Sequence, residues 1–111
     1  MVQRQSSRFH VQLPASFSGN RETGSGLITE LSLAGCSVIS EDTVRPGATL
    51  VLHVQLPADD APLKLEASVR WVDGPSFGLE FSRLRLEEKQ RLIRFMSALE
   101  RAEANRVRRA S

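Results

Sequence analysis

Two short groups of polar residues have the types and spacing needed to bind a small anion. Arg4 and Arg8 stand four positions apart, ahead of a predicted strand, and Glu30, Ser32 and Gly35 lie at the end of the next strand. A guanidinium fork binds phosphate or the O6/N7 edge of guanine through paired hydrogen bonds. A carboxylate can accept from guanine N–H groups, and glycine lets the backbone come close to a ligand. The set therefore suits a small, doubly charged ligand with guanine-like edges.

The hydropathy pattern around these residues predicts an all-β fold. Residues 9–17 alternate between apolar and polar side chains, as a half-buried strand does. Similar runs follow at residues 27–32, 36–40, 48–56, 63–71 and 77–81, and the glycine-rich residues 18–26 predict a hairpin loop. A period of two puts Ile28, Glu30 and Ser32 on one side of their strand, so both polar residues can meet one ligand. Six short strands predict an antiparallel barrel or sandwich.

The last part of the chain changes to a helical period. Leu92, Phe95, Met96 and Leu99 recur at helical spacing and form an apolar stripe. We expect this helix to pack its stripe over one end of the barrel. The expected organisation is a flexible arm at 1–8, a β-barrel at 9–82, a C-terminal helix at 83–104 and a disordered basic tail at 105–111.

With these elements in place, the chain resembles the PilZ domain, a bacterial receptor domain for cyclic di-GMP. The family pattern is R-x-x-x-R followed by [D/N]-x-S-x-x-G, and Arg4, Arg8, Ser32 and Gly35 match it. Glu30 departs from the pattern, because Asp or Asn is usual there. The resemblance covers roughly residues 4–100 and includes the strand Val69-Arg70-Trp71-Val72, the strand at 77–81 and the closing helix.

The resemblance implies a six-stranded antiparallel β-barrel capped by one α-helix, and a signalling receptor or adaptor. In such a receptor Arg4 and Arg8 would hold phosphates and guanine faces, and Glu30 a guanine edge. Ser32 would help with phosphate or base, and Gly35 would admit the ligand. Family members bind one ligand or a stacked pair. Binding would order the N-terminal arm and change the surface shown to a protein partner.

Glu30 leaves alternatives open. Its carboxylate accepts the same hydrogen bonds as Asp but reaches one methylene further, and a misplacement of about 1 Å loosens a site. Glu30 could instead be a solvent-facing acid, or pair with Arg4 or Arg8 in the free protein as a plug that ligand must displace. A second hypothesis for the whole chain is a PilZ-like adaptor that has lost cyclic di-GMP binding and docks partners through its helix.

Composition narrows the classes of function. The chain has 111 residues, of which 41% are hydrophobic and 25% charged, as expected for one globular domain. The net charge of +2 arises at the end, because residues 101–111 hold four arginines and one glutamate. The rest lacks the excess of basic residues that specific nucleic-acid binding needs. Contact of the basic tail with nucleic acid or an anionic membrane is a weaker alternative.

The remaining reactive residues give no support for an enzyme. Cys36, the only cysteine, is expected to be a small buried hydrophobe in a reducing compartment. His10 and His53 fall on polar faces of different strands, without the spaced ligands of a metal site. No catalytic or cofactor motif appears, and no apolar run approaches the ~20 residues of a membrane span, so we expect a cytoplasmic protein without a cofactor. Trp71 alternates with Val69, which predicts a place in the core.

Overall fold

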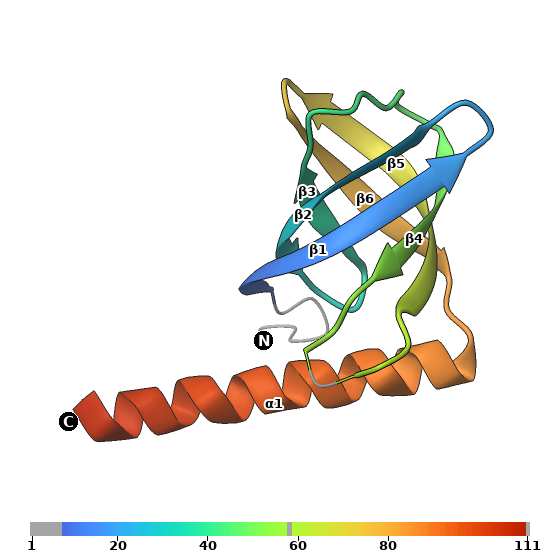
Figure 1. The fold of residues 1–111 in the computed structure, drawn as a ribbon. Helices are drawn as coiled ribbons and strands as arrows, with labels where there is room; N and C mark the ends of the chain where they lie inside the picture. The colour runs from blue at the N-terminus through green and yellow to red at the C-terminus, as the bar shows by residue number, and fades with distance from the viewer. Residues whose placement is uncertain (1–7, 58, 111) are drawn as a thin grey trace, which may run out of the picture.

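In the computed structural model, which describes residues 8–57 and 59–110, the chain forms a closed barrel and one helix (Figure 1). The strands are β1 (Phe9–Gly19), β2 (Thr23–Leu31), β3 (Gly35–Ile39), β4 (Thr49–Val54), β5 (Leu63–Asp73) and β6 (Ser76–Arg83), and the helix is α1 (Leu86–Ala110). Neighbouring strands pair antiparallel in the order β1-β2-β3-β6-β5-β4, and β4 pairs with β1 to close the barrel. The predicted antiparallel barrel with a C-terminal helix is confirmed.

Alternation along the strands builds the barrel interior. In β5, Leu63, Leu65 and Ala67 are fully buried, whereas Lys64 and Glu66 between them are exposed. Inside the barrel, the rings of Phe17 and Phe77 meet edge to face, with centroids 5.6 Å apart, an arrangement that aromatic pairs favour. Burial of one face of each strand is the main favourable term for this fold.

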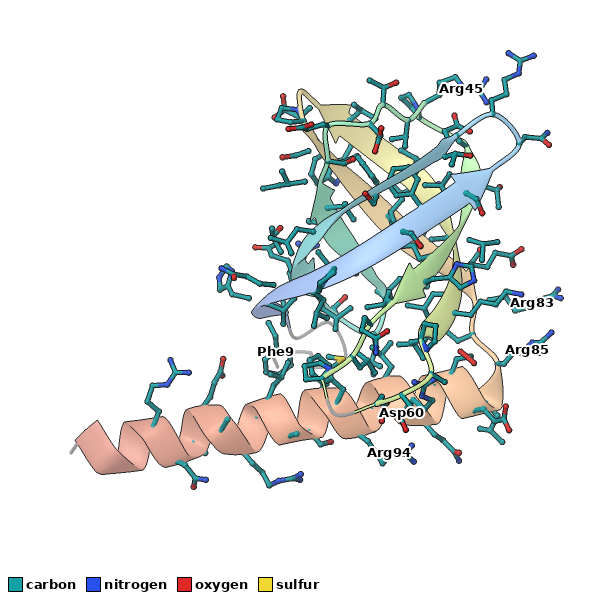
Figure 2. The ribbon with its side chains drawn as sticks, in the orientation of Figure 1. Phe9, Arg45, Asp60, Arg83, Arg85 and Arg94 are labelled. Carbon is teal, nitrogen blue, oxygen red and sulfur yellow. The ribbon has the colours of Figure 1, made fainter. Side chains whose placement is uncertain are left out.

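Helix α1 lies across one end of the barrel, and its C-terminal half projects past the strands (Figure 1). Leu92 and Met96 of α1 belong to the buried core, and Phe9 lies at the end of the barrel that faces the helix (Figure 2). The guanidinium of Arg91 donates to Asp59 Oδ2 at 3.1 Å and to the carbonyl of Pro62 at 3.2 Å. These bonds tie the helix to the loop between β4 and β5.

The helix bounds differ from those expected. α1 begins at Leu86 rather than residue 83, and it continues to Ala110, so residues 105–110 are helical rather than a disordered tail. Most of the residues after position 97 are alanine, glutamate and arginine, which favour helix, and neither glycine nor proline interrupts them. The expected flexible arm, residues 1–8, lies outside the described residues except for Arg8.

The loop expected at residues 18–26 is mostly strand. β1 continues to Gly19 and β2 begins at Thr23. A Cβ atom at Gly26 would lie 2.5 Å from the carbonyl oxygen of Ile39, and one at Gly24 would lie 2.5 Å from a carboxylate oxygen of Asp42. These glycines therefore allow neighbouring segments to approach closely, which is a known role of glycine in strands.

The barrel end opposite the helix holds an ion pair that the sequence did not indicate. Glu22 is only 5% exposed, and Arg45 donates from Nε to its Oε2 at 2.8 Å. Figure 2 shows Arg45 at this end. The hydrogen bond from Arg45 holds the pKa of Glu22 below its usual value, so Glu22 is charged at neutral pH. No helix in the described part of the chain is both long and apolar enough to cross a membrane.

Candidate functional site

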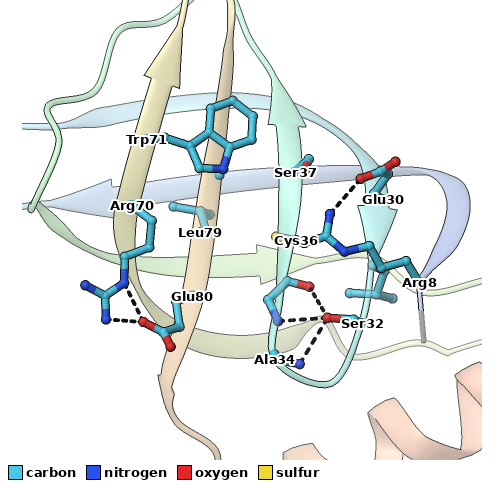
Figure 3. Close-up of a pocket in the computed structure, with 13 residues that line it drawn as sticks. Arg8, Glu30, Ser32, Ala34, Cys36, Ser37, Arg70, Trp71, Leu79 and Glu80 are labelled. Atoms are coloured by element: carbon cyan, nitrogen blue, oxygen red, sulfur yellow. Dashed lines mark hydrogen bonds and ion pairs between the residues drawn. The ribbon is translucent and has the colours of Figure 1, made fainter. Parts of the chain in front are cut away.

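The candidate site is a cleft of about 310 Å³ on the outside of the barrel (Figure 3). One wall carries Arg8, Glu30 and the turn between β2 and β3, and the other carries Arg70, Trp71 and Glu80 from β5 and β6. The volume is at the lower end of the range for small-molecule sites. The cleft is open, so a ligand larger than this volume can extend out of it.

Arg8 and Glu30 form an ion pair on the first wall. Arg8 Nη1 lies 3.0 Å from Glu30 Oε1, and His10 Nδ1 lies 3.9 Å from Glu30 Oε2. The pairing of β2 with β3 shifts between Ile28 and Glu30. This irregularity matters because Ile28 is fully buried, and strict alternation would send Glu30 into the core as well. The shift turns the carboxylate of Glu30 outward to the cleft.

Ser32 organises the turn between the two strands. Its hydroxyl oxygen accepts from the backbone N–H groups of Ala34 at 3.1 Å and Gly35 at 3.2 Å, and the hydroxyl donates to the carbonyl of Gly35 at 3.3 Å. The side chain is buried against this turn. Ser32 therefore fixes the backbone at the edge of the cleft, where its hydroxyl also lies (Figure 3).

Gly35 lines the cleft and also allows two strands to approach. A Cβ atom at this position would lie 2.0 Å from the carbonyl oxygen of Leu79 in β6. The contact is with backbone, which cannot move aside cheaply. A side chain at position 35 would therefore disturb the pairing of β3 with β6 before it affected any ligand.

Trp71 faces the cleft, so the expectation of a core position is wrong. The β5–β6 pairing shifts between Val69 and Trp71, and both Arg70 and Trp71 are exposed after the shift. The indole is 46% exposed and lies across Gly78, where a Cβ atom would be 2.1 Å from the indole nitrogen. A β-bulge of this kind re-aims side chains and is common beside binding sites.

The chemistry of the cleft is that of polar recognition. Burial raises the pKa of the Cys36 thiol to about 12, so this cysteine stays protonated and is a poor nucleophile. Among the described residues, no group of three or more metal-ligating side chains comes together. Four described residues with charged side chains line the cleft, Arg8, Arg70, Glu30 and Glu80.

The structure brings together four of the five residues predicted from the sequence, namely Arg8, Glu30, Ser32 and Gly35. Arg4 lies outside the described residues. Sequence reasoning missed Arg70, Trp71 and Glu80 as cleft residues. The adjacency of an arginine and a tryptophan was the available signal, but only the bulge places both on the outer surface.

Comparison with known proteins agrees with the geometry. The model of the PilZ domain family matches residues 2–98. The crystal structure of YcgR from Escherichia coli in complex with c-di-GMP superposes with a TM-score of 0.81 at 14% identity, over 98% of this chain and 51% of that one. The PilZ domain of CeSA from a cellulose-synthesizing bacterium gives a TM-score of 0.69 at 17% identity, over 86% of this chain and 99% of that one.

A third structure, the K. pneumonia MrkH complex with c-di-GMP, gives a TM-score of 0.70 at 16% identity, over 96% of this chain and 56% of that one. The chain thus spans about half the length of the YcgR and MrkH chains. No curated protein matches it. At these identities the structural likeness establishes the fold.

Proposed function

The chain belongs to the PilZ domain family, and on this premise we propose that it is a receptor that binds cyclic di-GMP in the cleft beside Arg8 and acts on a protein partner. One observation carries the proposal. Arg8, Glu30, Ser32 and Gly35, which fall at motif positions of the family, converge on a single cleft together with an exposed tryptophan. The YcgR and MrkH structures with c-di-GMP support the choice of ligand.

Arg8 supplies the main electrostatic contact. Its side chain is 69% exposed and is held by one carboxylate at 3.0 Å, and such exposed pairs are weak in water. A phosphodiester oxygen offers the guanidinium a charge-assisted bond of the same kind. Arg8 therefore leaves Glu30 for the ligand, and Arg4 joins it as the second arginine of the motif.

Glu30 then becomes available for the base. Once Arg8 has turned away, the carboxylate of Glu30 can accept from the N–H groups on the edge of guanine. Ser32 keeps the turn in place and offers its hydroxyl at the edge of the cleft. Gly35 places no side chain at that edge, so the ligand can approach the backbone. Ser32 and Gly35 match the family pattern, and Glu30 stands at the position where Asp or Asn is usual.

Trp71 provides a flat apolar surface for a guanine ring. Stacking of a base on an aromatic side chain contributes about 1–3 kcal/mol. Gly78 leaves room for the indole to lie flat along β6, because any side chain there would collide with it. A bound ligand would cover this wall and so change the surface that a partner meets.

The Arg8–Glu30 bond also favours a second candidate, an adaptor that no longer binds the nucleotide. Glu30 replaces the Asp or Asn that is usual in the family, and in the structure it holds Arg8 rather than leaving it free. If this pair were permanent, Arg8 would be unavailable to a ligand, and partner binding alone would remain.

Calorimetric titration separates the two candidates. The receptor proposal predicts saturable binding of cyclic di-GMP and much weaker binding of GMP and cyclic di-AMP. Arg8→Ala should weaken binding by about 1.5–3 kcal/mol, or roughly tenfold to a hundredfold, because it removes a charge-assisted fork. Arg101→Ala removes the same charge on the exposed helix and should bind like the parent. No heat at high micromolar protein and ligand would support the adaptor instead.

A further inference from the structure

Arg70 occupies an unusual position in its strand. β5 alternates inward and outward as far as Val69, and the register with β6 then shifts before Trp71. Arg70 is the extra residue of this bulge. The result is that two successive side chains, rather than one, project from the outer face, and both line the cleft. β-Bulges are over-represented beside active sites, where they re-aim side chains.

The Arg70 guanidinium is paired in the structure with Glu80. Both Nε and Nη2 of Arg70 contact Oε1 of Glu80. In the pairing of β5 with β6, Glu80 lies opposite Ser68. Figure 3 shows this pair on the wall opposite Arg8 and Glu30. The two side chains are 64% and 51% exposed. Solvent screens such a pair, and two long side chains must be ordered to keep it, so it exchanges partners readily.

The two walls of the cleft therefore repeat one arrangement. Each carries an arginine whose guanidinium is held by a glutamate, and the charges of the four described residues cancel. Cyclic di-GMP carries two phosphodiesters, each with one negative charge. A neutral cleft that holds two weakly bound guanidinium groups can accept both charges once each arginine turns from its glutamate toward the ligand.

We propose that Arg70 is a further ligand-binding residue. In the free protein Glu80 pairs with its guanidinium, and cyclic di-GMP displaces Glu80 from it. The inference rests on the proposed function and assigns Arg70 to a phosphodiester. Trp71, its neighbour in the chain, offers the stacking surface for a base, which leaves the guanidinium beside it for the phosphate. A ligand with a single phosphate cannot engage both walls, so Arg70 also favours the dinucleotide over GMP.

The test is calorimetric titration of the full chain with cyclic di-GMP. Arg70→Ala should weaken binding about tenfold or more, and Arg70→Lys should restore part of the loss, because lysine keeps the charge but not the fork. Arg101→Ala is the matched control, with the same charge change outside the cleft. Glu80→Gln should tighten binding severalfold, since it releases Arg70 and removes a negative charge from the cleft.

A structural role for Arg70 would not reproduce two further results. The gain from Glu80→Gln should shrink in the Arg70→Ala background, where no guanidinium remains to be released. The salt dependence of the dissociation constant should also be shallower for Arg70→Ala than for the parent, because one screened contact is lost. The melting temperatures of the variants should stay close to that of the parent.

The experiment distinguishes a failure of the role of Arg70 from a failure of the protein to bind cyclic di-GMP. If the parent binds cyclic di-GMP and Arg70→Ala binds as tightly as Arg101→Ala, the inference is wrong and the proposed function stands. If the parent does not bind at all, both are overturned. Additive effects of the Arg70 and Glu80 substitutions would also contradict the exchange, because they would show that the two side chains act separately.

Discussion

Glu30 is a carboxylate with two possible partners on the same wall of the cleft. In the structure it accepts from Arg8 at 3.0 Å, with His10 3.9 Å away, and in a complex it would accept from a guanine edge. Both contacts use the same oxygens, so they compete. We expect the length of the side chain to decide the balance, because glutamate reaches one methylene further than the Asp or Asn that is usual at this position.

Glu30→Asp should therefore tighten the binding of cyclic di-GMP. The shorter side chain weakens the contact with Arg8 but keeps an acceptor for the base, and we expect a gain of about 1 kcal/mol, roughly fivefold. Calorimetry on the parent, Glu30→Asp and Glu30→Ala measures it. Weaker binding by Glu30→Asp would show that Glu30 already makes its contact with the guanine at full strength.

Single residues were predicted best where a motif fixed their role. The two motifs together, with the family resemblance, placed Arg8, Ser32 and Gly35 in one predicted site, and the structure gathers them in one cleft. Their contacts with a ligand stay a prediction. Trp71 was misplaced because periodicity assumes an unbroken strand. One inserted residue reverses the faces of everything after it, and no residue type in the sequence marks the bulge.

At the level of elements, α1 covers one end of the barrel and also contributes side chains to the core. Leu92 is fully buried, and its neighbour Ile93 is 39% exposed on the same turn of the helix. The two aliphatic side chains have the same number of carbons, so they form a matched pair for the effect of burial.

Leu92→Ala should lower the free energy of unfolding by about 2–5 kcal/mol, because it removes buried methyl groups and leaves a cavity. Ile93→Ala should cost less than about 1 kcal/mol, as surface substitutions do. Urea unfolding of both variants provides the comparison. Equal losses would mean that α1 does not pack on the barrel through the face described above.

All six strands were predicted from alternation, but the residues at which they begin and end were not. Gly24 and Gly26 were assigned to a loop by their type, whereas in the structure they allow β2 to lie close to Ile39 and Asp42. The use of glycine for close approach depends on which segments become neighbours. That information lies in the closed order of the barrel and not in the local sequence.

For the whole molecule, the main asymmetry is the length of α1. The molecule measures 48 × 29 × 28 Å, and the helix of 25 residues spans about 37 Å at 1.5 Å per residue. Its first half covers the end of the barrel, and its second half extends past it (Figure 1). The residues from 100 to 106 are exposed, so they add nothing to the core.

Deletion of residues 105–111 should leave both folding and ligand affinity nearly unchanged. The deleted segment begins on the exposed part of α1, far along the chain from Leu92 and Met96, and we expect the melting temperature to change by less than about 3 °C. Thermal unfolding and calorimetry of the shortened chain check this. A large fall in melting temperature would show that the end of the helix supports the fold.

We propose that cyclic di-GMP binds in the cleft between Arg8 and Trp71, and tryptophan fluorescence tests this claim directly. Trp71 is the only tryptophan and the chain has no tyrosine, so the emission reports on one wall of this cleft. Titration with cyclic di-GMP should change the emission saturably, at the same midpoint as the calorimetric heat, whereas GMP at equal concentration should have little effect. Saturable heat with unchanged Trp71 emission, or no binding by either method, would contradict the claim.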